Sequence, residues 1–445
     1  MATSPNSEAA RCEEQARKAL DEDVHYLTSL TQMADVKQVV AREEVYTANG
    51  IKLIDKGVTI GSGLRERLLK HILLKPIDQS LEVKDGVGAE LLAREAGRLI
   101  AAEPYLQRLL GGGEEAHTTQ DALAALDIPA QLGFKLTVAR EQQPWLFEHM
   151  LMVALISHFL ALQKKLPLAQ RTDALLAGLV HDLGELHTDP ALLDRDHRIR
   201  EEEMRYVDVH PITGYLIAKE ILRSHPEVAT AVLQHQEKLD GSGYPYGLRG
   251  EAIGPLARII SIADACASII SRHRSSERLS ILMRLNRQKF DHSLVALLRK
   301  GLSHDDVAPS EPLDLAQIQA AAQLLQRWGE FSARIPGPPP SELTFLFERM
   351  GDLRVMLVQF GLDPEDTASI QAIAGDQEIA NELTAAFDEV RWQFASLQRE
   401  ALRRRDAITH ALPDAERQLL DEWLTEIDTY LRTVMPPSLA DAFSA

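Results

Sequence analysis

The stretch ALLAGLVHDLGE, residues 174–185, decides how the chain folds. Its first seven residues are small or apolar, as expected of a helix that packs in an apolar core. At the end of this helix the sequence places an imidazole next to a carboxylate, in His181 and Asp182. The pair can bind one metal ion, and the second carboxylate oxygen can bridge to another. The stretch therefore predicts a helical domain with a metal site.

Further histidines and an aspartate accompany this pair along the chain. His149 precedes it, His210 and His235 follow it, and Asp264 ends the apolar segment RIISIAD. In a helix, His149 shares one stripe with apolar residues spaced three and four positions apart, so we expect its side chain to point inward. Nitrogen and oxygen ligands without a thiolate favour iron or manganese. The set predicts a metal centre.

Residues 140–272 resemble an HD-GYP domain, a branch of the HD phosphohydrolase superfamily that is associated with hydrolysis of cyclic di-GMP. The resemblance rests on the motifs His181-Asp182, His210-Pro211 with Gly214, His235 with Glu237, Asp240-Gly241-Ser242-Gly243-Tyr244-Pro245, Arg258-Ile259 and Asp264. It implies a mainly α chain whose HD-type metallohydrolase domain is helical. The ligand sets that it implies are His149, His181, Asp182 and Asp264 for one ion, and Asp182, His210 and His235 for the next.

The chain departs from the family pattern at several positions. Gln236 stands where the family has a second consecutive histidine, and an amide oxygen is a poorer metal ligand than imidazole. Trp145 replaces a glutamate that serves a third metal, and Glu185 replaces the lysine that closes the HDxGK motif. The arginine and lysine that grip phosphates in the family fall on His273 and Ser276. We therefore expect one or two divalent ions, iron or manganese, in each chain.

The reaction implied by the resemblance is metal-assisted hydrolysis of a phosphodiester. The candidate catalytic residues are Asp182 and Glu185, of which Glu185 is a base, an extra ligand or a member of an exposed ion pair. The candidate substrate-binding residues are Gly243, Tyr244, Pro245, Arg272 and Arg274. The first three shape a lip of the active site or form only a turn, and the arginines contact phosphate or only end a solvated helix. His187, His197, His225 and His304 match no family position, and we expect them in solvent.

The rest of the chain is expected to add further parts around this domain. The predicted parts are an N-terminal helix or mobile arm over residues 1–35, a regulatory or dimerising α/β and helical module over 36–135, the HD-type domain over 136–300 and a C-terminal helical domain over 301–445. In the second part, Asn49-Gly50 predicts a tight hairpin. The last part carries 25 acidic and 11 basic residues and a Pro-rich linker at 336–340.

Composition and charge limit the partners of the chain. With 48 Lys and Arg against 66 Asp and Glu, the net charge of −18 repels polyanions, so we expect no nucleic acid polymer as a partner. The longest apolar stretch is interrupted at Ser157 and His158, so we expect no membrane span. Two cysteines and the lack of a signal-peptide pattern predict a cytoplasmic protein. The predicted partners are a cyclic dinucleotide and, through the N- or C-terminal domain, a second copy of the chain or a signalling protein.

Three functions stay open from the sequence, and we expect the first. It is a metal-dependent phosphodiesterase that hydrolyses cyclic di-GMP in bacterial second-messenger signalling. The second is a catalytically degenerate HD-GYP domain that acts as a nucleotide receptor or interaction scaffold, which Gln236, Glu185 and the missing basic residues favour. The third is an HD hydrolase for another phosphate ester, since a changed basic rim alters the substrate before it abolishes the metal chemistry.

Overall fold

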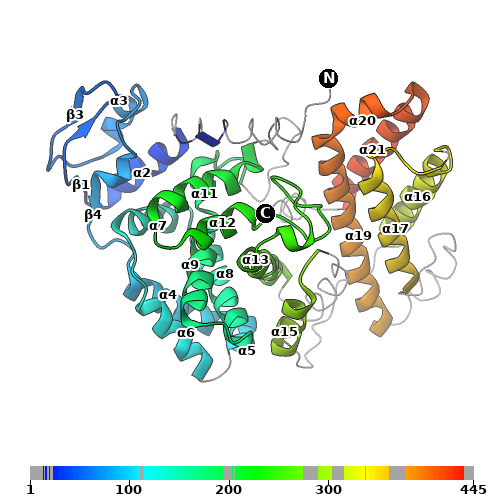
Figure 1. Ribbon diagram of the computed structural model, residues 1–445, viewed down its shortest axis with the longest axis horizontal. Coiled ribbons are helices and arrows are strands. Elements are labelled where there is room, and N and C mark those ends of the chain that lie inside the picture. Colours follow the sequence, from blue (N-terminus) through cyan, green and yellow to red (C-terminus); the bar gives the residue numbers. More distant parts are fainter. Residues whose placement is uncertain are drawn as a thin grey trace.

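Helices dominate the structure of the chain. The computed structural model describes residues 24–110, 114–193, 206–273, 289–302, 315–335, 337–359 and 377–434, together with residues 14, 16, 17, 20 and 203. Most of these residues are helical, and two small sheets accompany the helices (Figure 1). The prediction of a mainly α chain with a small N-terminal α/β module is confirmed.

The N-terminal module combines short strands with one longer helix. Its elements are α2 (Val24–Val36), β1 (Val39–Ala41), β2 (Val45–Tyr46), β3 (Lys52–Ile54), η1 (Ser62–Leu64), α3 (Arg65–Leu69), η2 (Ile77–Gln79) and β4 (Leu81–Val83). Strand β1 pairs with β4 and β2 pairs with β3, both antiparallel. The β2–β3 turn contains Gly50 at φ +79°, a left-handed conformation that glycine adopts without a clash, so the predicted hairpin is confirmed.

A bundle of helices follows and carries the predicted metal ligands. Its elements are α4 (Ala89–Ala102), α5 (Pro104–Leu110), α6 (Glu114–Ala124), α7 (Ala130–Gln142), α8 (Pro144–Gln163), α9 (Leu168–Val180), η3 (Leu183–His187), α11 (His210–Ile221), α12 (Pro226–Gln234), η4 (Gly250–Ala252), α13 (Pro255–His273) and α15 (His292–Leu302). Helix α8 packs against α7, α9 and α13. Of the described helices, α8 alone is long and apolar enough to cross a membrane, and 78% of its apolar window is buried inside the protein. Helix α8 is thus the core helix of the bundle.

Helices α8 and α9 approach each other closely at Gly178. A Cβ atom on this residue would lie 2.6 Å from Ala154 Cα, and the other nearest atoms are also backbone. The close approach brings the end of α9 to the turn of α8 that carries His149, and the rings of His149 and His181 lie 5.3 Å apart between centroids. A glycine inside the first motif therefore sets the spacing of two predicted ligands.

The C-terminal helices enclose an apolar core of their own. They are α16 (Leu315–Ser332), α17 (Thr344–Gln359), α19 (Gln377–Arg403), α20 (Arg405–Ala411) and α21 (Asp414–Val434). Trp328, Phe394 and Trp423 meet in this core, where the Trp423 indole donates a hydrogen bond to the Leu324 carbonyl over 2.9 Å. The large aromatic side chains bury much apolar area, and this burial explains how a segment with so many acidic residues folds.

The N-terminal module and the central bundle share a single apolar core. Its buried residues run from Tyr26 in α2 to Leu302 in α15. Figure 1 shows the N-terminal module in blue and the C-terminal helices in yellow to red on opposite sides of this bundle. The boundaries predicted at residues 35, 135 and 300 stay predictions.

Candidate metal centre

Five helices bring the six predicted metal ligands together. The ligands are His149 on α8, His181 and Asp182 at the end of α9, His210 at the start of α11, His235 at the end of α12 and Asp264 within α13. All are buried except His149, whose side chain is 13% exposed. Two groups of three hold their ligand atoms within 4.8 Å of one another, namely His149, His181 and Asp182, and Asp182, His210 and His235.

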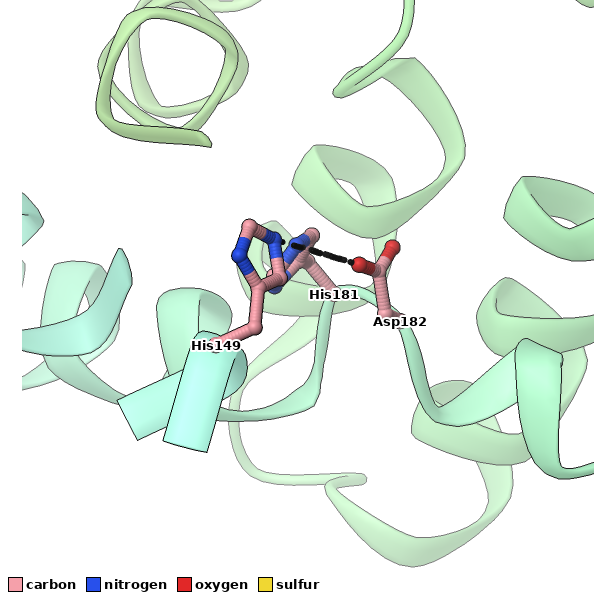
Figure 2. Close-up of side chains that lie close together, drawn as sticks. All are labelled: His149, His181 and Asp182. Carbon is pink, nitrogen blue, oxygen red and sulfur yellow. Dashed lines mark ion pairs between the residues drawn. The ribbon is translucent and has the colours of Figure 1, made fainter. Parts of the chain in front are cut away.

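Asp182 lies between two pairs of histidines. Its Oδ2 lies 2.8 Å from His181 Nε2 and 3.6 Å from His149 Nε2, and Figure 2 shows these three side chains pointing toward one another. Its Oδ1 lies 3.3 Å from His235 Nε2 and 3.5 Å from His210 Nε2. Each carboxylate oxygen thus faces one pair of imidazoles, as a carboxylate that bridges two metal ions does.

Main-chain carbonyls fix the orientation of three histidines. Nδ1 of His181, His210 and His235 lies 2.9, 2.8 and 2.6 Å, respectively, from the carbonyl oxygen three residues earlier in the chain. Because a carbonyl only accepts, each Nδ1 donates its proton, which leaves Nε2, on the side of Asp182, as the nitrogen that can bind a metal ion. A hydrogen bond from the other ring nitrogen is the usual way in which proteins orient a metal-binding histidine.

Buried acceptor atoms meet at the centre without donors to satisfy them. The Nε2 atoms of His210 and His235 lie 3.2 Å apart. His181 Nε2, Asp182 Oδ1 and Glu185 Oε2 are buried and make no hydrogen bond among the described residues. Such a concentration of buried acceptors is costly unless cations or protons neutralise it. The residues present therefore fit divalent metal ions.

Gln236 supports a ligand instead of lying among the ligands. Its Nε2 donates a hydrogen bond to Asp264 Oδ2 over 3.2 Å, while Asp264 Oδ1 lies 3.1 Å from His149 Nε2. The contact with His149 outweighs burial and lowers the pKa of Asp264 to about 2. From the sequence alone, Gln236 is expected only to be a weaker metal ligand. Its hydrogen bond to Asp264 cannot be predicted there, because it depends on how α12 and α13 pack.

Glu185 is a buried acid at the edge of the centre. It follows Asp182 on η3, and only 5% of the residue is exposed. Burial, with the nearby charges of Asp182 and Asp264, raises the pKa of Glu185 well above its ordinary value. The expectation of an exposed ion pair is wrong, because η3 packs under α11 and away from solvent. The roles of base and extra ligand stay open.

The DGSGYP segment folds over the part of the chain that carries His235. A Cβ atom on Gly243 would lie 2.3 Å from the Gln236 carbonyl oxygen, so only glycine fits there. The Glu237 carboxylate accepts hydrogen bonds from the main-chain N–H groups of Tyr246 and Leu248 over 2.7 and 2.8 Å. The Tyr244 ring stands edge-on to His210, with 6.1 Å between centroids. Tyr244 thus lies beside the metal centre, and Gly243 packs on the main chain that follows His235.

The structure describes no side-chain contacts for the two arginines that are predicted to bind substrate. Arg274 lies outside the described residues. Arg272 is the last residue but one of α13, and only its helical backbone is described. Their contact with a phosphate stays a prediction.

The prediction that His187 lies in solvent is wrong. Its ring stacks on Tyr26 with 4.9 Å between centroids, and its Nε2 lies 3.4 Å from Lys135 Nζ. Helix α2, far away in the sequence, covers η3 and excludes water from it. His225 is half-buried and its Nδ1 lies 2.7 Å from Asp173 Oδ1. These burials could not be read from the polar context of either histidine. The other two, His197 and His304, lie outside the described residues.

Comparison with known proteins agrees with this geometry. Residues 136–294 match the family model described as HD domain. HD domains are metal-dependent, and the six converging ligands lie within the matched residues. The matched residues and the ligands that converge within them thus support an HD domain of the HD-GYP type in this part of the chain.

The matched curated relatives are bacterial phosphodiesterases. The chain is 33% identical over 145 residues to 3'3'-cGAMP-specific phosphodiesterase 1 of Vibrio cholerae, covering 32% of this chain and 33% of the relative. It is 32% identical over 125 residues to a cyclic di-GMP phosphodiesterase of Pseudomonas aeruginosa, covering 28% and 30%. A solved structure, the HDG"Y"P protein Bd1817 of Bdellovibrio bacteriovorus, has 18% identity and a TM-score of 0.33 over 59% of this chain and 94% of that one. The chain spans about a third of the length of these two curated relatives.

Proposed function

We propose that this protein is a cytoplasmic phosphodiesterase that hydrolyses cyclic di-GMP in bacterial second-messenger signalling. The observation that carries the proposal is Asp182, with one carboxylate oxygen toward each of two pairs of histidines. Relatives about 30% identical in this region are named phosphodiesterases of cyclic di-GMP or of cGAMP. A cyclic dinucleotide is therefore the substrate class that the centre and the relatives favour together.

The ligand sets assign a position to each of two ions. His149, His181, Asp182 and Asp264 would hold one, and Asp182, His210 and His235 the other. The nitrogen and oxygen donors suit iron or manganese. When bound, such ions supply Lewis-acid polarisation of the phosphodiester and lower the pKa of water at the site.

The protein's own groups prepare this chemistry. The main-chain carbonyls behind His181, His210 and His235 orient each ring so that Nε2 faces Asp182, and Gln236 fixes the orientation of Asp264. Burial raises the pKa of the Glu185 carboxyl group at the edge of the centre, which suits it to give a proton to a departing oxygen. The lip at Tyr244 offers an aromatic edge beside His210 on which a nucleotide can rest.

Metal content and product analysis test the proposal. Full-length protein purified without chelator is incubated with cyclic di-GMP, 3'3'-cGAMP and bis(p-nitrophenyl) phosphate in the presence of Mn²⁺ or Fe²⁺. We expect two ions per chain and turnover of a cyclic dinucleotide. Asp182→Asn removes the carboxylate charge with little change in shape and should abolish metal binding and turnover. Asp173→Asn on α9 should retain metal binding and turnover. Turnover that survives Asp182→Asn would refute the proposal.

A nucleotide receptor without turnover is the second candidate. Gln236 favours it, because its side chain is engaged with Asp264 and the second group has one imidazole fewer than the resemblance implies. This candidate predicts at most one ion per chain and saturable binding of cyclic di-GMP without product. Turnover of bis(p-nitrophenyl) phosphate without action on either cyclic dinucleotide would instead indicate a hydrolase for another phosphate ester.

A further inference from the structure

The C-terminal domain reaches the metal centre through one arginine. Arg403, the last residue of α19, places Nε 2.5 Å from Asp208 Oδ2 and Nη2 2.8 Å from Asp208 Oδ1. The carbon of its guanidinium lies 4.8 Å from the centroid of the Tyr244 ring. Asp208 precedes the predicted ligand His210 by two residues, and the Tyr244 ring contacts His210 from the other side. Figure 1 shows α19 beside the loops of the central bundle.

The neighbouring arginine on the same helix behaves differently. Arg404 Nη2 pairs with Glu400 Oε1 over 2.6 Å, and its guanidinium lies 4.6 Å from the Phe345 ring, so its contacts stay inside the C-terminal domain. The two adjacent arginines therefore contact different domains. Of the two, Arg403 contacts the HD-type domain, so a substitution of Arg404 is the matched control for the same substitution of Arg403.

The Arg403–Asp208 pair lies at an accessible place. The two side chains are 26% and 19% exposed, so the pair is partly open to solvent. A second contact holds the domain in register, because Lys289 Nζ donates to Gln393 Oε1 on α19 over 3.3 Å. The guanidinium of Arg403 on α19 thus lies against Tyr244 of the lip.

A cyclic dinucleotide needs positive charge at two places. It carries two phosphodiester groups, and metal ions held at the centre would engage one of them. Besides the histidines, the side chains around the centre include the carboxylates of Asp182, Asp208 and Asp264, which repel the second phosphate. An arginine offers a planar fork that fits the oxygens of a carboxylate or a phosphate, so a group that holds Asp208 can also bind a phosphodiester.

We propose that Arg403 binds the second phosphate of the substrate and so makes the C-terminal domain part of the active site. Asp208 holds the guanidinium of Arg403 at the lip in the free protein. The guanidinium also contacts the Tyr244 ring, so only this ring separates its positive charge from the predicted metal ligand His210. This inference rests on the proposed function and deepens it, because it makes a substrate with two phosphates preferred over one with a single phosphate.

Substrates with one and two phosphodiesters separate the possible roles of Arg403. Metal-loaded full-length protein is compared as wild type, Arg403→Ala and Arg404→Ala, with kcat and KM measured for cyclic di-GMP and for bis(p-nitrophenyl) phosphate, and the Kd of cyclic di-GMP by calorimetry. We expect Arg403→Ala to raise the KM and the Kd for cyclic di-GMP by about tenfold or more, because a charge-assisted hydrogen bond is lost. For bis(p-nitrophenyl) phosphate, which has a single phosphate, the increase in KM should be at least about tenfold smaller. Arg404→Ala should match the wild type, and Arg403→Lys should restore part of the affinity.

Other outcomes overturn the inference in recognisable ways. An equal loss with both substrates would make Arg403 a structural support, and a gain with both would make it a latch that shuts the site. Wild-type protein that binds but does not cleave cyclic di-GMP refutes the proposed function alone, because the Kd of Arg403→Ala still tests the contact. Wild-type protein that neither binds nor cleaves cyclic di-GMP, while it cleaves bis(p-nitrophenyl) phosphate, overturns both.

Discussion

Gln236 and Asp264 form a buried hydrogen bond, from the amide Nε2 to the carboxylate Oδ2 over 3.2 Å. The amide therefore acts on the metal centre through a neighbour. The aspartate keeps its other oxygen toward His149, at 3.1 Å from Nε2. A position where the sequence suggests a lost ligand is in this way a support for a retained one.

Replacing Gln236 by leucine should weaken metal binding. Without the amide, Asp264 loses the donor that orients it, and a loss of about ten- to hundredfold in metal affinity is expected. Titration of metal-free protein with Mn²⁺ measures it. Gln236→His gives the control, since an imidazole can bind metal itself and should raise occupancy of the second group. Equal affinity in wild type and Gln236→Leu would show that the hydrogen bond is idle.

Replacing Glu185 by glutamine should slow turnover without removing metal. The amide has the shape of the protonated acid but cannot exchange a proton, so kcat should fall by about a hundredfold or more. Elemental analysis should find the same metal content as in wild type. If metal is lost together with activity, Glu185 is a ligand; if kcat is unchanged, it has no part in proton transfer.

His158 should make stability depend on pH in the acid range. Its Nδ1 lies 2.9 Å from Thr119 Oγ1 inside the bundle, and burial, with the nearby charge of Arg171, lowers its pKa from 6.5 to about 4. Between pH 6.5 and about 4, the His158 side chain is protonated in the unfolded chain but not in the folded chain. The stability is thus fully present above pH 6.5 and is lost as pH falls toward 4, by an amount on the order of 3 kcal/mol.

Urea unfolding at several pH values checks the contribution of His158. The slope of unfolding free energy between pH 6.5 and 4 should be smaller in His158→Gln than in wild type. His410→Gln, at an exposed position, controls for the loss of a histidine as such. An unchanged slope in His158→Gln would assign the acid sensitivity to other groups.

Two glycine-to-alanine substitutions should have opposite effects. At Gly178 a Cβ would lie 2.6 Å from Ala154 Cα, so Gly178→Ala forces α8 and α9 apart and should cost about 1–3 kcal/mol. At Gly351 in α17 a Cβ meets no atom within 4 Å, so Gly351→Ala should stabilise by about 0.5–1 kcal/mol. Thermal unfolding measures both. Equal shifts at both sites would mean that the helix contact tolerates a methyl group.

The buried ion pair of Lys135 and Asp78 should be strongly coupled. Nζ lies 2.9 Å from Oδ2, and at most 4% of either side chain is exposed. Asp78→Asn leaves the ammonium without its charge partner and should cost about 3–5 kcal/mol, whereas Asp78→Leu with Lys135→Met should recover much of it. Asp55→Asn in the exposed pair with Lys52 is the control, with less than about 1 kcal/mol expected. Chemical denaturation measures all three variants.

The resemblance to a known family, and not local signals alone, points to the six residues that the structure brings together. Their role as metal ligands stays a prediction. Three features escape such reasoning because they depend on packing between distant segments. They are the support of Asp264 by Gln236, the burial of His187 under α2, and the arrival of Arg403 from 195 residues beyond Asp208.

The core shared by the N-terminal module and the central bundle makes these two parts one cooperative unit. Removing the module would uncover apolar faces of the bundle, so a shortened fragment that begins at α7 should be destabilised. The ring of Tyr26 on α2 stacks on His187, two residues from Glu185 on the same 3₁₀ turn. The packing of α2 thus supports the turn that carries the buried acid at the candidate metal centre.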